Sequence, residues 1–461
     1  MSDREFQNEI ITPDTQLSMD SDMIFFIKNA IDEGDFAHVI SLTTNFHPSE
    51  IVEIINLLDK SDRKKFVNAI SEVFEPEVLI GLEGEIKDQI MHQLGSKQSA
   101  NAISKLELDD AVHVIEDLET KEINDILEKV EGKKRSEIEG NLSYPEDSAG
   151  RLMDSKFIAV EEDWTVGRTI DFLRENKNLP DDFYEVFVID SDRKPVGGVL
   201  TSRIIRNKRE MQISELISEN LKTINVLMDQ EEVAYIFQKY SLVSTPVVDD
   251  GGRIIGVLTL DDVVNIIEEE VEEDIMRLAG VSEIDIYSSS VNTALNRTPW
   301  LIINLFTAIA ASAVIALFQN EIRDLVALAV LMPIIASMAG NAGTQTLTVA
   351  VRSIATKELT EANSSRVLRK EILASLLNGL IFATVMMAAS YLIYNNLYLS
   401  VVLGVATILS LLLASIFGVV IPLVLSKIGV DPAISSSVFL TTITDVSSFF
   451  FFLGLSSWWL F

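Results

Sequence analysis

Asp445 is the one ionisable residue in the stretch 432–461, which otherwise has the composition of a membrane-spanning segment. A charged side chain at the centre of a bilayer costs on the order of 3 kcal/mol even on insertion-based scales, so such residues usually face a water-filled path or a partner. No Lys, Arg or His in the neighbouring apolar segments could neutralise Asp445, whereas a cation could. We therefore predict a cation-conducting membrane protein with Asp445 in the conduction path; a buried structural acid and a proton relay are the alternatives.

Hydroxyl side chains lead up to this carboxylate, and we expect Thr441 and Thr444 among them to line the path. Their oxygens could hold the water shell of a hydrated cation. One carboxylate among polar oxygens suits Mg²⁺, which sheds its waters reluctantly. The hydroxyl-bearing residues are Ser435, Ser436, Ser437, Thr441, Thr442 and Thr444.

A second polar string, Gly340-Asn341-Ala342-Gly343-Thr344-Gln345, follows Pro333 inside another apolar stretch. Glycines permit close helix approach, and amide and hydroxyl side chains offer oxygens at membrane depth. We expect Pro333 and Gly340 to interrupt the helix, and Gly340, Asn341, Gly343 and Gln345 to line the pore. A helix-packing motif with interhelical hydrogen bonds is the alternative.

Five apolar stretches are long enough to span a bilayer, which needs about 20 residues. The loop 352–370 is the most basic connection, so we place it on the cytoplasmic side. We expect the protein to lie in the cell membrane. With an odd number of spans, its N-terminus is then in the cytoplasm and its C-terminus outside the cell. The stretches are 300–318, 325–351, 372–394, 397–425 and 432–461.

The formal net charge of −32 lies entirely before residue 298. From there onward seven basic residues balance seven acidic ones, which leaves 30 of the 37 basic and 62 of the 69 acidic residues in 1–297. Such a charge repels nucleic acid and favours cations as partners. The chain has no cysteine and four histidines, so oxygen ligands for Mg²⁺ or Ca²⁺ are more plausible than a zinc site.

The acidic part divides into two regions of different character. Short amphipathic helices fill residues 20–140, which predicts an all-α superhelical N domain over 1–145. Residues 150–268 alternate strands and helices and contain a repeat of 58 residues, from Gly198 to Gly256. This repeat resembles an α/β tandem pair of CBS domains, which we place at 146–268. Thr259 with Asp262 resembles a ribose-binding pair, whereas the first repeat has Ile204 at the position of the Asp, so ATP binding stays open.

Acids are dense just beyond the repeat, at Glu268–Glu270 and Glu272–Asp274. Like charges at helical neighbour spacing destabilise a helix by a few tenths of a kcal/mol per pair. A solvated face is one interpretation. We predict a long acidic linking (plug) helix over 269–297 and a five-helix transmembrane domain over 298–461. Because this helix joins the acidic part of the chain to the transmembrane domain, we favour divalent ions that bridge its acids to acids elsewhere.

The order of parts over nearly the whole chain resembles the MgtE family of magnesium channels. The specific strings are Tyr144–Met153 at the domain junction, Pro333 with Gly340–Gln345, and Gly429–Ala433 followed by Thr444-Asp445-Val446. The resemblance implies a homodimeric Mg²⁺ channel with Asp445 of each subunit holding a hydrated ion. It also implies closure by cytosolic Mg²⁺ at regulatory acids, which match here Asp109, Asp229, Glu231, Asp262, Glu270, Glu273, Asp274 and Asp431.

The chain departs from the family pattern at a few positions. His113, Ser241 and Asn265 stand where members have acids, and Ser437-Val438 replaces an Asn- or Gly-Pro before the pore acid, which could alter a helix break there. Two other functions stay open: a divalent-cation carrier coupled to Na⁺ or H⁺, and a membrane-anchored nucleotide sensor using the CBS pair. No nucleophile–base constellation, P-loop or hydrolase metal motif predicts an enzyme.

Overall fold

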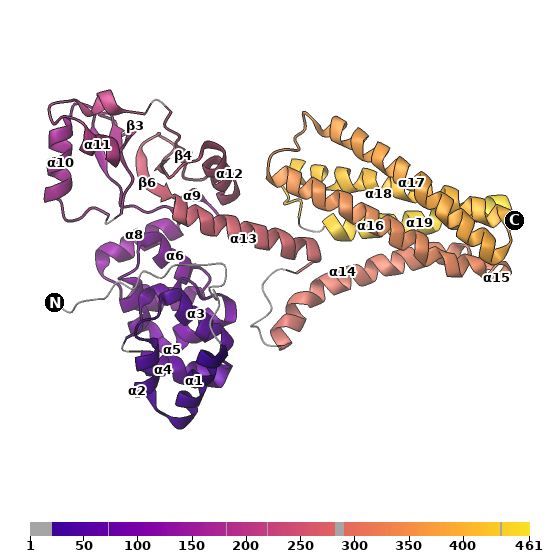
Figure 1. Ribbon diagram of the computed structural model, residues 1–461, viewed down its shortest axis with the longest axis horizontal. Coiled ribbons are helices and arrows are strands. Elements are labelled where there is room, and N and C mark those ends of the chain that lie inside the picture. Colours follow the sequence, from indigo (N-terminus) through magenta and orange to yellow (C-terminus); the bar gives the residue numbers. More distant parts are fainter. Residues whose placement is uncertain (1–20, 72, 181, 219, 282–289, 434–435) are drawn as a thin grey trace. The chain divides into compact units, whose positions relative to one another are not determined.

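The computed structural model describes all residues except 1–20, 72, 181, 219, 282–289 and 434–435. The chain divides into two compact units, the first ending at Ile266 and the second beginning at Ile267. Figure 1 labels the elements of both. The predicted multi-domain class is confirmed: a helical domain and a tandem α/β pair make up the first unit, and a bundle of long apolar helices dominates the second.

The helical domain has its own hydrophobic core, in which Ile54, Phe66 and Ile115 are fully buried. Amphipathic spacing explains this arrangement, since each short helix buries one apolar stripe. Lys87 is also buried, and its ammonium donates to Asp117 at 2.7 Å. The elements are α1 (Ser21–Glu33), α2 (Phe36–Thr43), α3 (Pro48–Leu57), α4 (Lys60–Ile70), the 3-10 turn η1 (Pro76–Leu79), α5 (Gly84–Ile103), α6 (Leu108–Glu116), α7 (Thr120–Leu127) and α8 (Gly132–Leu142).

The sequence repeat becomes two three-stranded sheets of the same topology. In each sheet the first strand pairs parallel to the second, and the second pairs antiparallel to the third. The register is irregular at matching places, after Val188 and after Val247, which fits the repeat. The elements are α9 (Ala149–Leu152), β1 (Ala159–Glu161), α10 (Val166–Glu175), β2 (Glu185–Ile189), β3 (Pro195–Leu200), α11 (Thr201–Arg206), η2 (Ile213–Leu216), β4 (Ile224–Asn225), α12 (Gln230–Tyr240), β5 (Ser244–Val248) and β6 (Ile254–Thr259).

The Tyr144–Met153 string ties the helical domain to the second repeat. The backbone amides of Ala149 and Gly150 donate to carbonyls beside β4, both at 2.8 Å. A Cβ on Gly150 would lie 2.6 Å from Val226 and 2.7 Å from Tyr144, so no larger residue fits there. The string therefore has a structural role that accounts for its composition.

The acidic helix α13 (Leu260–Ala279) begins earlier and ends earlier than the predicted linking helix over 269–297. It starts directly after β6 and stops before Gly280, whose φ of +74° takes the backbone out of the helical region. Residues 282–289 of the predicted segment lie outside the described part of the chain, and the remainder belongs to the next helix.

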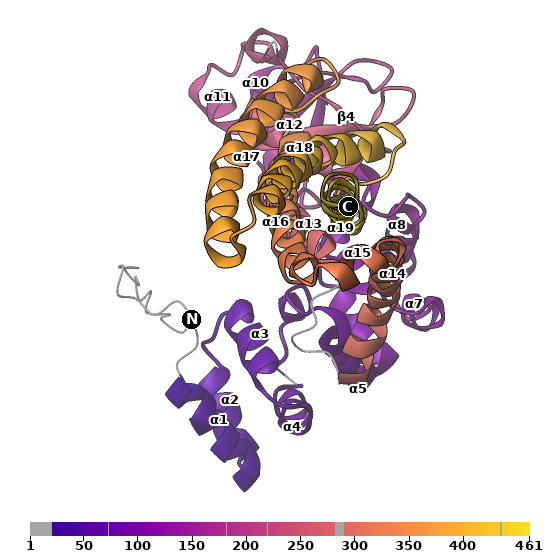
Figure 2. The ribbon, with the colours of Figure 1, turned by 90° about the vertical axis from the view of Figure 1, so that its right-hand side faces the viewer.

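Among the residues that the structure describes, five helices of the second unit are long and apolar enough to cross a membrane, as predicted. The central helix α18 packs against α16, α17 and α19, which Figure 2 shows in a view along the bundle. Glycine permits this closeness: a Cβ on Gly418 would lie 3.0 Å from the carbonyl oxygen of Gly343. The helices are α14 (Ser290–Leu317), α16 (Ala327–Ala355), α17 (Ser364–Tyr394), α18 (Leu397–Lys427) and α19 (Ser436–Leu460), with a short α15 (Gln319–Asp324).

The expected interruption of the second span is wrong. α16 runs unbroken through both Pro333 and Gly340. Pro333 stands in the second turn, where few helical hydrogen bonds precede it, and Gly340 keeps helical geometry because unpaired backbone groups are costly in lipid. The carbonyl of Gly340 also accepts the hydroxyl of Thr344 at 2.9 Å. No free carbonyls are therefore offered at this string.

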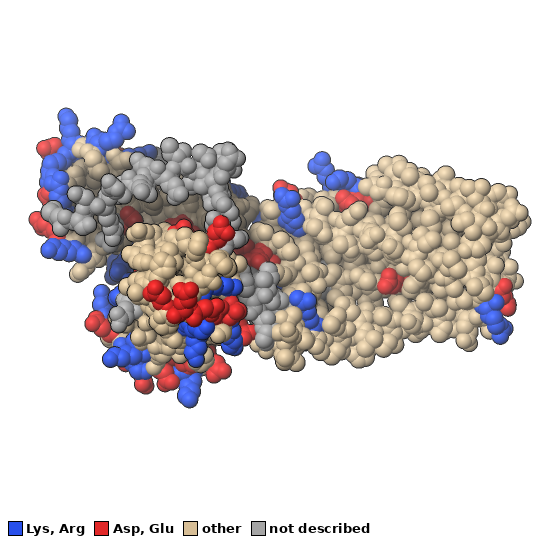
Figure 3. All heavy atoms as spheres, turned by 60° about the horizontal axis from the view of Figure 1, so that its bottom comes forward, with Lys and Arg blue, Asp and Glu red and all other residues tan. Residues whose placement is uncertain are grey.

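Charged side chains are distributed very differently over the two units. Figure 3 shows Lys, Arg, Asp and Glu spread over the first unit, whereas the second shows a broad, mostly uncharged surface with an acidic patch near its middle, and its few bases lie toward its ends. Large apolar side chains of the second unit, such as Leu377 and Leu392, are exposed. This distribution is the one that a hydrocarbon environment requires.

Candidate ion path and cation-sensing sites

Asp445 lies on α19 with its side chain partly buried. Among the described residues it has no hydrogen bond or ion pair, and no charged side chain lies close to it. Thr441 is one turn before it and Ser448 one turn after it, on the same face of the helix. The surroundings of the carboxylate are thus polar but uncharged, and a cation would be its only counter-charge.

The threonines around Asp445 are arranged as acceptors. The hydroxyls of Thr441, Thr442 and Thr444 donate to backbone carbonyls of the preceding turn, at 2.8, 2.7 and 3.0 Å. Because each hydroxyl proton is engaged inside the helix, the oxygen lone pairs of Thr441 and Thr442, which are not fully buried, remain to accept hydrogen bonds from water. Thr441 is exposed and Thr444 is buried, so the bundle separates these two predicted pore-lining residues. Ser437 and Val438 lie within α19 and cause no helix break.

The polar string on α16 divides into two faces. Gly343 is buried against α19, where an added Cβ would lie 3.2 Å from Leu440. Asn341, Thr344 and Gln345 are exposed on the single chain, together with Thr348 one turn further on. Gly340 lies between the two faces and contacts nothing in the position of a Cβ. The string therefore places a glycine at a helix contact and amides on an outer face, and pore lining by these residues stays a prediction.

That outer face is unsuited to lipid. Carboxamide groups have two donors and an acceptor each, and hydrocarbon satisfies none of them. Asn341, Gln345 and Thr348 are spaced by four and three residues, which places them in one stripe along α16. A stripe of this kind requires water, or a second polar surface, against it.

The described part of the first unit contains one close pair of predicted regulatory acids, Asp109 and Asp262. Asp109 stands in the first turn of α6, and Asp262 in the first turn of α13, where its Oδ2 accepts from the amide and the hydroxyl of Thr259 at 3.1 and 2.7 Å. Burial, and then the charge of Asp262, raises the pKa of Asp109 to about 9. The two carboxyl groups therefore share a proton near neutral pH.

More acids surround this pair than bases. Burial raises the pKa of Glu107, Asp110 and Asp154, and it lowers the pKa of Lys134. The Oδ1 atom of Asp109 is buried without a hydrogen-bond partner among the described residues. A hydrated divalent ion fits such a site, since Mg²⁺ commonly binds through one or two carboxylates and keeps several waters. The described residues hold no preformed group of three ligands.

Asp229 and Glu231 have a different setting from the other predicted acids. Asp229 is the N-cap of α12, and its Oδ1 accepts from the amide of Glu231 at 2.9 Å. The neighbouring amide of Gln230 donates to the carbonyl of Asp147, in the junction string, at 2.7 Å. The cap accounts for Asp229 structurally, and a metal role for the two acids stays a prediction.

A second group of acids lies at the end of α13, within the second unit. Burial, and then the charges of Asp431 and Glu270, raises the pKa of Asp274 to about 6. Arg277, which the sequence analysis overlooked, pairs both with Glu273 on its own helix and with Asp431 beyond α18. Its isolation was a usable signal, because it is the only base between Arg253 and Arg297.

Positions where the chain departs from the family pattern fit their surroundings. The Nδ1 atom of His113 lies 3.6 Å from Glu116, and Ser241 ends α12 with a φ of +51°. Asn265 is exposed on α13. These three residues therefore have local structural roles, or none, in the described part of the chain.

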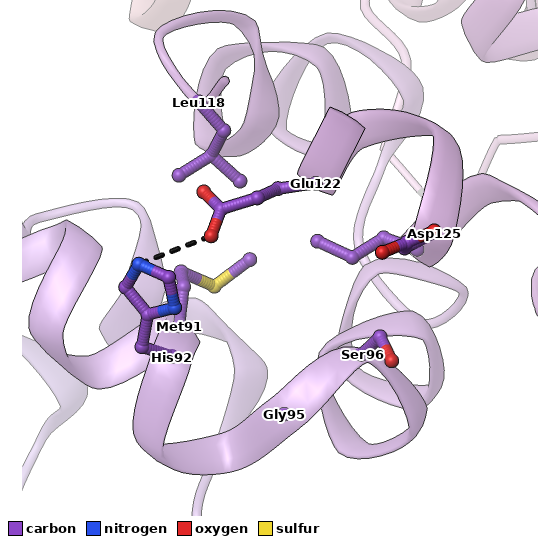
Figure 4. A pocket seen from close by; sticks show the side chains of 8 residues that line it. Met91, His92, Gly95, Ser96, Leu118, Glu122 and Asp125 are labelled. Carbon is purple, nitrogen blue, oxygen red and sulfur yellow. Dashed lines mark ion pairs between the residues drawn. The ribbon is translucent and has the colours of Figure 1, made fainter. Parts of the chain in front are cut away.

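A small cavity that the sequence did not predict lies between α5 and α7. It encloses about 180 Å³ and is lined by Met91, His92, Gly95, Ser96, Leu118, Glu122, Asp125 and Ile126. Figure 4 shows the imidazole of His92 beside Glu122, 3.0 Å away, with the Asp125 carboxylate at the far side of the cavity. The ion pair spans the two helices next to the kink at Gly95, whose φ is +69°.

Sequence comparisons cover all three regions. A family model described as a divalent cation transporter matches residues 332–455, and the model of the MgtE intracellular N domain matches 46–147. Models of the CBS domain match 149–210 and 213–269.

Several magnesium transporters named MgtE are similar along most of the chain. The protein from Enterococcus faecalis is 30% identical over 70% of this chain and 72% of its own length. The Thermus thermophilus protein is 28% identical over 95% of this chain and 98% of its own. Among solved structures, the cytosolic domain of the Mg²⁺ channel MgtE in complex with ATP is 25% identical, with a TM-score of 0.48 over 53% of this chain and 99% of that one.

Proposed function

Because the chain belongs to the MgtE family of magnesium transporters, we propose that it is a channel that admits Mg²⁺ through the cell membrane. Asp445 carries the proposal: it is partly buried on a spanning helix, without a partner among the described residues and beside hydroxyls whose lone pairs are free. The carboxylate attracts a hydrated ion, and the threonine oxygens accept from its waters. The membrane potential drives entry, at roughly 2.3 kcal/mol per charge per 100 mV.

Growth of an uptake-deficient strain at low Mg²⁺ tests this role. Asp445→Ala is expected to abolish rescue, and Asp445→Glu to retain part of it because the carboxylate remains. Asp324→Asn is the matched control, since it removes an exposed carboxylate from the same unit. Rescue by Asp445→Ala at the level of the wild type would contradict the proposal.

The channel is a homodimer in this proposal, with the outer faces of α16 from two copies enclosing water. Support comes from the stripe of Asn341, Gln345 and Thr348, which hydrocarbon cannot satisfy. Because the chain lacks cysteine, one introduced thiol reports on this contact cleanly. Asn341→Cys is expected to form a disulfide-linked dimer in membranes. Leu377→Cys on the exposed side of α17 is the control and should stay monomeric on a denaturing gel.

Cytosolic Mg²⁺ closes this channel by replacing the shared proton at acid pairs. Asp109 and Asp262 support this part, because two buried carboxyl groups at one contact repel once both are ionised. The ion then stabilises the compact arrangement that alone brings both acids together. Protection of the soluble unit from trypsin is expected to rise with Mg²⁺; equal cleavage with and without Mg²⁺ would contradict gating.

The orientation follows from the connections between spans. Exposed bases lie on both sides of the connection between α16 and α17: Arg352 at the end of α16, Lys357 in the loop, and Arg366 and Arg369 at the start of α17. This connection is placed on the cytoplasmic side, with the N-terminus. The C-terminus then lies outside. Accessibility of a C-terminal tag on intact cells checks this arrangement.

Two other activities lead to different measurements. An ion-coupled carrier would show flux in a fixed ratio to Na⁺ or H⁺, whereas the channel shows unitary currents. A nucleotide sensor anchored by its spans would keep Mg²⁺ flux unchanged in Asp445→Ala. ATP as a modulator would use Thr259 and Asp262, and their mutual hydrogen bond must open for the ribose to bind.

A further inference from the structure

The end of α13 contains a single positive charge in an acidic group. The guanidinium of Arg277 contacts Glu273, one turn earlier on the helix, and Asp431, which follows α18. Asp431 uses its second oxygen to accept the amide of Ala433 at 2.7 Å. Each oxygen of Asp431 thus has a partner, so another cation that binds this carboxylate competes with Arg277 for its charge.

Arg277 stands where a divalent ion is expected. Glu270, Glu273, Asp274 and Asp431 are the four predicted regulatory acids of the second unit, and Asp274 lies close to both Glu270 and Asp431. A guanidinium is planar, permanently charged and able to hold two carboxylates at once. It therefore makes the same kind of bridge between α13 and the α18–α19 connection that a divalent ion would make.

We propose that Arg277 is a tethered cation that occupies Asp431 and Glu273 and competes with divalent ions for them, which sets the Mg²⁺ concentration at which α13 is fixed to the membrane unit. The inference rests on the proposed gating function and deepens it. At low Mg²⁺ the ion pair between Arg277 and Asp431 holds α13 weakly to the α18–α19 connection. Divalent ions must overcome this contact, because a nearby positive charge and a direct competitor both lower cation affinity.

Divalent binding to the purified full-length protein tests the inference, with Mn²⁺ as the probe and free Mn²⁺ followed by electron paramagnetic resonance. Arg277→Gln is expected to lower the midpoint of the tightest binding phase by about tenfold, a typical coupling between sites. Arg277→Lys, which keeps the charge, should remain within a few-fold of the wild type. Arg253→Gln is the matched control, because it removes an i,i+4 ion pair with Asp249 on the first unit.

A double variant tests whether the higher Mn²⁺ affinity expected for Arg277→Gln depends on the carboxylate of Asp431. Adding Asp431→Asn to Arg277→Gln should return the midpoint to that of the wild type or weaken it further. Cleavage within α13 by a protease gives a second readout: Arg277→Gln should be more sensitive than the wild type without Mg²⁺ and protected at a lower Mg²⁺ concentration. A purely structural role would raise the sensitivity at every concentration and leave the Mn²⁺ midpoint unchanged, which would overturn the inference.

Failure of the inference and failure of the proposed function can be distinguished. Binding and protection are measured without flux, so they stand even if the wild type carries no Mg²⁺. Wild-type uptake together with an unchanged or weaker Mn²⁺ midpoint in Arg277→Gln refutes the role of Arg277 alone.

Discussion

The two units place aspartates, the ligands of the proposed function, in opposite electrostatic surroundings. Asp445 stands alone in the stretch 298–461, whose charges balance, whereas Asp109 meets Asp262 within residues 1–297, which have 62 acids and 30 bases. An isolated carboxylate with no protein counter-charge attracts a passing ion. A carboxylate crowded by other acids holds a proton until an ion replaces it. The difference suggests how one residue type serves both conduction and sensing.

The largest expected effect separates the two roles. Asp445→Asn removes the negative charge that holds the hydrated ion; a loss of about 3 kcal/mol, as for a strong hydrogen bond to a charged group, corresponds to about 100-fold in occupancy, so uptake should fall by about that factor. Protection of the soluble unit by Mg²⁺ should remain at the wild-type midpoint, measured by limited trypsin digestion. A parallel loss of protection would mean that the two units are not functionally separate.

Asp109→Asn makes the complementary test. An amide replaces the proton-sharing carboxyl and can donate to Asp262 without repulsion, so the contact should form without a divalent ion. We expect the Mg²⁺ midpoint for protection to fall by about tenfold, or the dependence to disappear. Asp110→Asn, on the same helical turn, is the control and should shift the midpoint less.

The pH dependence follows from the pKa of Asp109, which burial and Asp262 raise from its ordinary value of 3.8 to about 9. The folded state then binds the proton more tightly than the unfolded state, so stability from this group is full below about pH 4 and is lost as the pH rises through about 9. Hydrogen exchange of the α6 amides should accelerate between pH 7 and 10, after correction for intrinsic rates. Mg²⁺ or Asp109→Asn should reduce this change, and an unaltered acceleration in Asp109→Asn would exclude the pair as its origin.

The smallest effects are expected from contacts between the apolar helices of the second unit. A Cβ on Gly418 meets the backbone carbonyl of Gly343 at 3.0 Å, which cannot move easily, whereas a Cβ on Gly343 meets the flexible end of Leu440. We expect Gly418→Ala to cost about 2 kcal/mol and Gly343→Ala about 1 kcal/mol. Thermal unfolding in detergent measures both, and the reverse order would contradict this view of the α16–α18 contact.

Much of the fold could be predicted because the signals are local. The five spans follow from apolar length, and the repeat from Gly198 to Gly256 predicts two similar sheets. The expected break at Pro333 and Gly340 was wrong because a bilayer penalises free backbone groups more than it penalises a proline near a helix start. Helix propensity alone does not include the cost of unpaired backbone groups in lipid.

The partners of the candidate site residues could not be predicted from the sequence. Spacing identified the exposed amides of α16, yet only the bundle shows that Gly343 faces inward. Arg277 was missed because its partner Asp431 is 154 residues away, a distance that no periodic pattern reports. Asp229 also shows the limit of a resemblance, since its cap on α12 gives a local role to an acid that the family resemblance assigned to metal binding.

Mg²⁺ current through the purified protein in a planar bilayer tests the central claim most directly. Under a potential that drives cations inward, the wild type should give unitary Mg²⁺ currents, which decrease when Mg²⁺ is raised on the side of the soluble unit. Asp445→Asn should give no current, although it should fold and bind Mn²⁺ at the acids of the first unit and of α13 as the wild type does. Currents of normal size through Asp445→Asn would contradict a conduction path at this carboxylate.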